Sequence, residues 1–175
     1  MTPPAEFSEK LRQSWTGLVD GSTPALPLNR TSRERGEAIF SGAFNPFHDG
    51  HREMAEVAAG LLDTTVAFEI SIANVDKPAL EFSDAVDRVG QFGMEQPIWL
   101  TRAATFAEKS ALFPRCTFVV GADTIFRIGQ PLYYGGSVAA VDAAIDRFVA
   151  AGCRFLVFGR LGDGRFKTIE QCGLP

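Results

Sequence analysis

From Ala38 onward, short apolar runs alternate with longer amphipathic stretches, and this alternation constrains the fold more than any other feature of the sequence. Apolar runs occupy residues 38–44, 65–72, 97–101, 116–124 and 153–160, and stretches of helical periodicity lie between them at residues 50–63, 82–94, 103–113 and 137–152. This order is typical of βα units with parallel strands. We therefore predict an α/β fold with a doubly wound parallel sheet of about five strands, helices on both faces, and a ligand site beyond the carboxyl ends of the strands.

The chain of 175 residues is long enough for one domain with a substantial core. Residues 1–36 differ from the rest, because an amphipathic stretch is followed by a segment rich in Pro, Ser, Thr and Arg. We expect an N-terminal helix and a linker over residues 1–36, and the α/β domain over residues 37–175. Arg30, Arg33 and Arg35 fall in the expected linker, where we interpret them as solvated side chains.

The composition argues against two broad classes of partner. The formal net charge is −4, so the chain lacks the positive field that holds a nucleic-acid backbone, and we expect no nucleic-acid partner. No apolar run reaches the roughly 18 residues of a membrane span, and the N-terminus lacks the order of a secretion signal. These features predict a cytoplasmic protein. Cys116, Cys153 and Cys172 are widely spaced and odd in number, so we expect reduced, buried thiols.

Both histidines of the chain, His48 and His51, lie in the segment SGAFNPFHDGHREM directly after the first predicted strand. Gly42 and Gly50 permit close backbone approach, and the free amides that open the following helix form an anion site. Imidazoles placed there donate hydrogen bonds to phosphate and offset negative charge. We therefore predict a phosphate site with His48 and His51 as the catalytic pair. Metal ligation is the weaker alternative, since no third histidine or nearby cysteine pair completes a zinc set.

The pattern formed by Gly42, Phe44, Pro46, His48, Gly50 and His51 resembles the signature of the HxGH nucleotidyltransferase superfamily. Three later segments, FEISIANVDKP, FAEKSALFPRCTFVVGADT and CRFLVFGR, are similar in order and spacing to a cytidylyltransferase-like group related to nicotinamide and nicotinate mononucleotide adenylyltransferases. The resemblance covers residues 38–168. It implies a Rossmann-like sheet and the transfer of AMP or CMP from ATP or CTP to a phosphorylated small molecule, with release of pyrophosphate. A pyridine mononucleotide is the favoured acceptor, and Mg²⁺ is the implied cofactor.

Further candidate residues lie at the ends of the predicted strands, where a doubly wound sheet binds its ligands. The expected nucleotide-binding residues are Gly42, Ala43, Phe44, Asn45, Gly50, Gly121, Asp123 and Arg160, and the expected substrate-binding residues are Asn74, Lys77, Trp99 and Arg102. Simpler interpretations stay open for several of them. Asp123 is equally suited to cap the following turn, Trp99 to a core position and Lys77 to a solvated turn. Arg102 and Arg160 are equally typical of an exposed surface.

The sequence also bears on two alternative functions. Members of the superfamily normally carry a Ser/Thr-rich phosphate-binding motif near the C-terminus, and the sequence up to Pro175 does not contain it. A nucleotide-binding module of the same fold with little or no transferase activity is therefore the second hypothesis. An NAD(P)-binding oxidoreductase does not fit, because no G-x-G-x-x-G spacing follows the first strand. The sequence leaves open which acceptor is used and whether the chains form a homo-oligomer.

Overall fold

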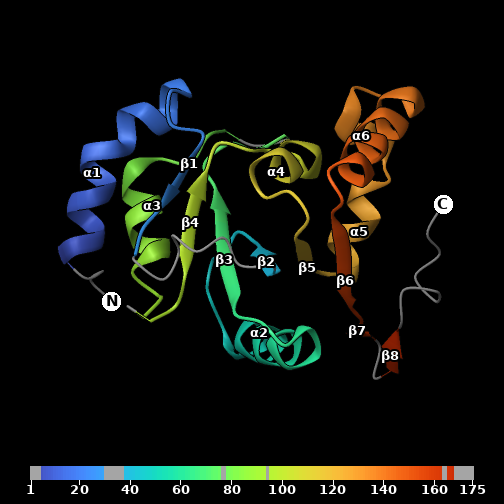
Figure 1. The fold of residues 1–175 in the computed structure, drawn as a ribbon, viewed down its shortest axis with the longest axis horizontal. Coiled ribbons are helices and arrows are strands. Elements are labelled where there is room, and N and C mark those ends of the chain that lie inside the picture. The colour runs from blue at the N-terminus through green and yellow to red at the C-terminus, as the bar shows by residue number, and fades with distance from the viewer. Residues whose placement is uncertain (1–4, 30–37, 76–77, 94, 163–164, 168–175) are drawn as a thin grey trace.

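A mostly parallel sheet forms the centre of the computed structural model, which describes residues 5–29, 38–75, 78–93, 95–162 and 165–167 (Figure 1). Its six strands, in chain order, are β1 (Ala25–Pro27), β2 (Ala38–Ser41), β3 (Val66–Ser71), β4 (Ile98–Thr101), β5 (Thr117–Gly121) and β6 (Arg154–Phe158). They lie in the order β1-β4-β3-β2-β5-β6. β2 to β6 pair in parallel, and β1 pairs antiparallel with β4 at one edge. Two short strands, β7 (Arg160–Gly162) and β8 (Arg165–Lys167), form a separate antiparallel pair.

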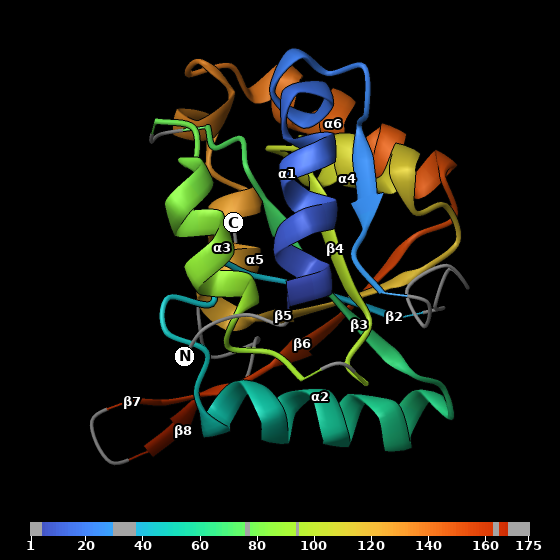
Figure 2. The same ribbon diagram turned by 90° about the vertical axis from the view of Figure 1, so that its left-hand side faces the viewer.

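Helices cover both faces of this sheet, which confirms the predicted Rossmann-like α/β architecture. One face is covered by α1 (Ala5–Asp20), α2 (Asp49–Leu62) and α3 (Phe82–Val89), and the other by α4 (Phe106–Leu112) and α6 (Val138–Ala150). Figure 2 shows α2 on one side of the strands and α4 and α6 on the other. The strand side chains alternate between the two layers, so Phe40 and Phe68 face α2 while Ile39 and Phe118 face α4 and α6.

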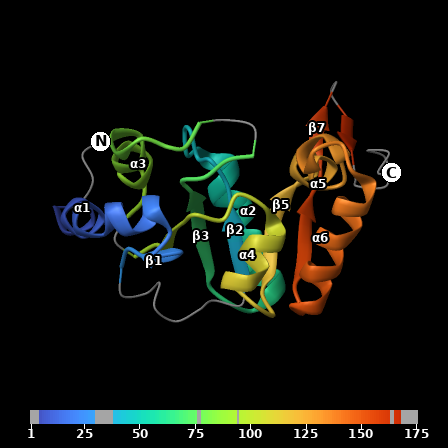
Figure 3. The same ribbon diagram turned by 90° about the horizontal axis from the view of Figure 1, so that it is seen from above.

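Local chemistry explains where several helices begin and end. α4 begins after Thr105, whose hydroxyl accepts a hydrogen bond from the Glu108 amide at 3.3 Å, while the Glu108 carboxylate accepts from the Thr105 amide at 2.9 Å. α3 ends at Val89 although the periodicity predicts a helix to residue 94, because the chain beyond Gly90 turns inward and buries Phe92. α5 (Ala122–Ile128) and the 3-10 helix η2 (Pro131–Tyr134) connect β5 to α6, as Figure 3 shows for α5 from above.

The N-terminal segment contributes to the sheet and to its core. Residues 25–27 lie in the stretch expected to be a linker, yet they form β1, with Leu26 opposite Leu100. Leu18 of α1 is 0% exposed, and Trp15 meets Phe82 of α3 edge to face with 5.3 Å between the ring centroids. A strand of three residues is too short to produce a periodic signal in the sequence, which is why the linker interpretation missed it.

Two further expectations concern membranes and cysteines. Among the described residues, no helix is both long enough and apolar enough to span a membrane. Cys116 and Cys153 precede the neighbouring strands β5 and β6, and both are buried and free of disulfide bonds, as expected. Burial raises the pKa of the Cys116 thiol, so this sulfur is unreactive at neutral pH. Cys172 lies outside the described residues.

Leu18→Ala tests whether α1 belongs to the core. The substitution removes a fully buried side chain, so we expect the free energy of unfolding to fall by about 2–5 kcal/mol. Val19→Ala is the matched control on the same helix, because Val19 is 49% exposed and its truncation should change stability little. Chemical denaturation measures both values, and equal small losses in the two variants would mean that α1 is not part of the cooperative core.

Candidate functional site

The order of the strands places the candidate site at the edge of the sheet where the parallel strands have their carboxyl ends. The chain runs from β2 outward through β3 to β4, and then returns to the other side of β2 to form β5 and β6. The connections after β2 and β5 therefore diverge, which is where open α/β sheets form a crevice for ligands. His48 and His51 follow β2, Gly121 ends β5 and Asp123 follows it, so the structure brings these predicted segments to the same edge.

His48 and His51 form a stacked pair at the start of α2. Their ring centroids are 3.7 Å apart with an interplanar angle of 22°. The backbone N–H of His48 donates a hydrogen bond to Nδ1 of His51 at 3.3 Å, so the hydrogen of the neutral His51 ring lies on Nε2. His48 is exposed and His51 is half-buried. Both rings therefore stand at a helix N-terminus, where backbone amides also favour an anion.

Phenylalanine rings surround His51 on the side of the core. The centroids of Phe44, Phe40 and Phe47 lie 5.1, 5.8 and 5.8 Å from that of the imidazole. Burial among these rings lowers the pKa of His51 below its ordinary value of 6.5, and the nearby His48 lowers the pKa further. At neutral pH the free imidazole is therefore mainly neutral, and it offers a hydrogen-bond donor at Nε2.

Ring packing explains Gly42 in the histidine loop, which we define as residues 42–48, and Gly50 just after it. A Cβ atom on Gly42 would lie 2.8 Å from the Phe44 ring. A Cβ atom on Gly50, in the first turn of α2, would lie 3.2 Å from the His48 ring. Phe44 has a φ of 45° and is only 2% exposed, so its side chain belongs to the core and only its backbone is available to a nucleotide. Ala43 and Asn45, on either side of it, are exposed.

Two side chains hold the histidine loop in place, one within α3 and one just after its end. The guanidinium of Arg88 donates a hydrogen bond to the carbonyl of Ala43 at 3.0 Å. Gln91 holds the loop at two points, because its amide nitrogen donates to the Phe44 carbonyl at 3.0 Å and its amide oxygen accepts from the Phe47 N–H at 2.7 Å. These bonds satisfy backbone groups that the irregular loop cannot pair with itself.

A cleft of about 160 Å³ lies among the connections that follow β3, β4 and β5. Its polar side chains are Asn74, Thr105, Thr124, Arg127, Tyr133 and Tyr134. Arg127 can bind a phosphate group, and the tyrosine rings can pack against a planar group. Burial raises the pKa of the Tyr134 phenol, which is therefore a neutral donor and acceptor at physiological pH.

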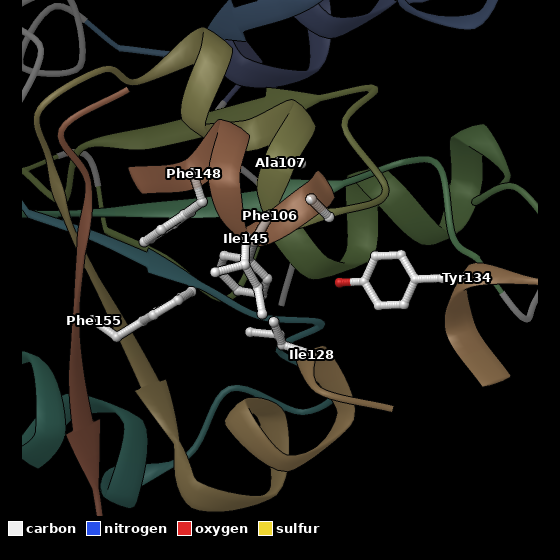
Figure 4. Close-up of a pocket in the computed structure, with 8 residues that line it drawn as sticks. Phe106, Ala107, Ile128, Tyr134, Ile145, Phe148 and Phe155 are labelled. Atoms are coloured by element: carbon white, nitrogen blue, oxygen red, sulfur yellow. The ribbon is translucent and has the colours of Figure 1, made fainter. Parts of the chain in front are cut away.

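The cleft borders a second, smaller cavity of about 40 Å³ with apolar walls (Figure 4). Phe106, Ile128 and Tyr134 line both spaces. Phe148 and Phe155 complete the far wall, with parallel rings whose centroids are 4.3 Å apart. Figure 4 shows the Tyr134 hydroxyl pointing toward the apolar side chains. The polar cleft thus leads to an apolar end.

A match to a known family covers the histidine loop and the residues that line the cleft, except Tyr134. A sequence model described as cytidylyltransferase-like matches residues 39–133, a stretch that begins in β2, contains the histidine loop and ends in η2. The chain belongs to the cytidylyltransferase-like family. Membership confirms the cytidylyltransferase-like and HxGH resemblance at the level of the superfamily, without distinguishing the pyridine-mononucleotide branch, and indicates a function of the nucleotidyltransferase type. No curated protein and no solved structure matches the chain.

In this cytidylyltransferase-like chain, Asn74, Gly121 and Asp123 lie at the predicted edge. The Asn74 amide donates to the carbonyl of Pro78 at 3.4 Å, and Asn74 lines the cleft. Gly121 precedes α5, and Asp123 is exposed in the first turn of that helix. Lys77 lies outside the described residues. Arg160 begins β7, and its side chain is likewise outside the described part.

Trp99 and Arg102 need correction, since the structure separates both from the cleft. Trp99 is 7% exposed and packs against Phe113 with 5.3 Å between the ring centroids, so it is a core residue on the face that α4 covers. The Arg102 guanidinium lies against the α1–β1 turn, where a Cβ atom on Gly21 would be 3.1 Å from it. The end of β4 at Thr101 was predicted correctly. The side chain of Trp99 points to the face of the sheet that α4 covers, and that of Arg102 points toward the turn before β1, and the sequence could not show either direction.

The site also contains residues that the sequence interpretation missed. Arg88 and Gln91 touch the histidine loop from more than 40 residues away, and no local pattern indicates such contacts. Arg127, Tyr133 and Tyr134 follow the VVGADT strand end, and the pair of tyrosines between Pro131 and Gly135 could have been recognised as part of a strand-end connection. The described residues contain no group of three or more His, Cys, Asp or Glu side chains that could hold a metal ion.

The environment of His51 predicts a pKa below 6.5 for this imidazole. The unfolded chain binds the proton more tightly, so the free energy of unfolding should fall as the pH drops from 6.5 toward the lower pKa of the folded protein, and then level off. Since the chain has two histidines, His48→Asn leaves a single imidazole signal for an NMR titration. A midpoint at or above 6.5 would contradict the aromatic environment described here.

Gln91→Leu should loosen the histidine loop. The substitution leaves the Phe47 N–H and the Phe44 carbonyl without this partner, and the free energy of unfolding should fall by about 1–3 kcal/mol. Gln13→Leu on the exposed face of α1 is the matched control, with little expected change. Denaturation measures stability, and amide exchange at Phe47 measures the loop. Unchanged exchange at Phe47 would show that other contacts hold the loop.

Proposed function

We propose that this protein is a nucleotidyltransferase that moves AMP or CMP from ATP or CTP to the phosphate of a small molecule and releases pyrophosphate. The stacked pair of His48 and His51 at the N-terminus of α2 is the observation that carries the proposal. The family match supports the reaction type. Among acceptors, a pyridine mononucleotide is the one we favour, because it combines a phosphate with a planar ring.

In the proposed reaction, an oxygen of the acceptor phosphate attacks the α-phosphorus of the nucleotide. A new phosphorus–oxygen bond forms, the bond to the β-phosphate bridge breaks, and pyrophosphate leaves with that electron pair. His51 donates from Nε2 to a phosphate oxygen, and His48 donates beside it, so that both stabilise the charge of the transition state. The rest of the catalysis is positioning, and no covalent enzyme intermediate is required.

The cleft among the connections that follow β3, β4 and β5 is our proposed acceptor site. Arg127 would bind the acceptor phosphate, and Tyr133 and Tyr134 would contact its ring. Asn74 and Thr124 supply hydrogen-bonding groups to the same space. The proposed partners are therefore a nucleoside triphosphate at the histidine loop and a phosphorylated small molecule in the cleft, with the two phosphates meeting between them.

Mg²⁺ would accompany the triphosphate in this reaction. The ion is typically held by substrate phosphates and waters with one or two carboxylates. Asp123, in the first turn of α5, would accept a hydrogen bond from a metal-bound water or from a ribose hydroxyl. When bound, Mg²⁺ would offset charge on the leaving pyrophosphate.

Pyrophosphate release in the presence of Mg²⁺ tests this proposal. ATP and CTP are each combined with nicotinamide mononucleotide, nicotinate mononucleotide, phosphopantetheine and glycerol 3-phosphate. We expect release that requires both substrates, with a pyridine mononucleotide as the acceptor. His51→Ala removes one donor to the transition state and should lower kcat about 100- to 1,000-fold.

Glu53→Ala is the matched control, because Glu53 is exposed on the same helix and should not affect turnover. Near-normal turnover in His51→Ala would rule out the proposed role of the histidine pair. If ATP or CTP binds and raises the pKa of His51 while no combination releases pyrophosphate, the chain is a nucleotide-binding module instead of a transferase.

A further inference from the structure

Glu69 is a charged residue in the middle of a buried strand. It lies on β3 among Val66, Ala67, Phe68 and Ile70, and it is 0% exposed. A buried carboxylate costs several kcal/mol unless other groups compensate it, and an apolar residue at such a position is often neutral or stabilising. Core stability alone therefore does not explain a glutamate at this position. The contacts of the Glu69 side chain suggest a different role.

The carboxylate of Glu69 connects β4 and α4. Lys109 of α4, itself buried, donates hydrogen bonds from its ammonium to both oxygens at 2.7 Å. Thr101, the last residue of β4, donates its hydroxyl to Oε1. The same Thr101 oxygen accepts from the Ala103 N–H at 3.3 Å. The Glu69 side chain thus fixes both ends of the β4–α4 connection.

That connection forms one wall of the cleft. Ala104, Thr105 and Phe106 line the cleft, and Lys109 lies one helical turn beyond Thr105. The ammonium of Lys109 is also 5.9 Å from the centroid of the Phe106 ring. A change in the position of Lys109 would therefore move the wall that the proposed acceptor contacts.

The backbone of Glu69 holds the histidine loop at the same time. Its carbonyl accepts a hydrogen bond from the N–H of Gly42 at 3.1 Å, and Ser41 stands beside Glu69 in the register of β2 and β3. One residue therefore anchors the histidine loop through its main chain and the cleft wall through its side chain. The spacing between these two parts decides whether the two phosphates can meet in line, and displacements near 1 Å cost about 100-fold in rate.

We propose that Glu69, Lys109 and Thr101 are positioning residues that set the distance between the histidine loop and the cleft wall. This inference rests on the proposed transferase function. The three residues are buried and do not line the cleft, so they act through Thr105 and Phe106. Substitution of the side chains leaves the backbone bond to Gly42 intact, so the effect should fall on the acceptor and spare the nucleotide.

The double variant Glu69→Leu/Lys109→Met separates positioning from stability. It removes both charges together and keeps similar volumes, so the denaturation midpoint should stay unchanged or rise. We expect kcat/KM for the acceptor to fall about tenfold or more, while KM for the nucleotide stays within about twofold. Glu69→Gln/Lys109→Gln keeps hydrogen-bonding groups without charge and should recover part of the lost kcat/KM.

Ser110→Ala is the control, because it removes a buried hydrogen bond to Ala107 on the same helix without touching Glu69. Its kcat/KM should match that of the parent chain. If the apolar pair folds and keeps full kcat/KM for the acceptor, the positioning role is overturned. If the apolar pair does not fold, the glutamine pair decides the same comparison.

Amide exchange gives a readout that does not need turnover. In the apolar pair, the amides of residues 103–106 should exchange at least about tenfold faster, whereas the Gly42 amide should keep its protection. Unchanged exchange at residues 103–106 overturns the inference. A parent chain that releases no pyrophosphate with any substrate pair would refute the proposed function, while the exchange result would still decide whether Glu69 positions the wall.

Discussion

The parallel pairing of β2 with both β3 and β5 is the constraint on which the candidate site depends. Parallel strands place all their carboxyl ends at one edge, and the reversal of strand order beside β2 separates the loops that follow β2 and β5. Residues that are 75 positions apart in sequence, such as His48 and Asp123, therefore reach the same edge. Such a sheet must be covered on both faces, and α2 and α4 supply that cover while their first turns line the site.

Two sets of polar contacts connect this scaffold to its irregular loops, one half-buried at Gln91 and one fully buried at Glu69. Gln91 bonds two backbone groups of the histidine loop from the side of α3. The Glu69 carboxylate accepts hydrogen bonds from Lys109 and Thr101 on the other face of the sheet, which α4 covers. An irregular loop cannot pair its own backbone N–H and C=O groups as a helix does. Side chains from the rigid elements supply the missing hydrogen bonds. The geometry of the site is thus set by residues that do not themselves face a ligand.

The position of His51 combines two opposing demands. Packing against Phe40, Phe44 and Phe47 fixes the orientation of the ring but also lowers the pKa of the imidazole. A neutral imidazole is a good hydrogen-bond donor at Nε2, and a bound polyphosphate would raise the pKa again by attraction. Under the proposed function, nucleotide binding would therefore favour the positively charged form of His51.

The βα order, the placement of the histidine motif at a strand end and the family could all be predicted from the amino-acid sequence. These follow from hydrophobic periodicity and from a local run of residues, both of which are encoded within a few neighbouring positions. Local information could not show that Trp99 faces α4, that Arg102 lies against the α1–β1 turn or that residues 25–27 form a strand. These side-chain directions became visible in the folded chain alone, as did the contacts of Gln91 and Glu69 and the cleft that contains Tyr133 and Arg127. Each of them depends on segments that are far apart in the sequence and that meet because of the order of the strands.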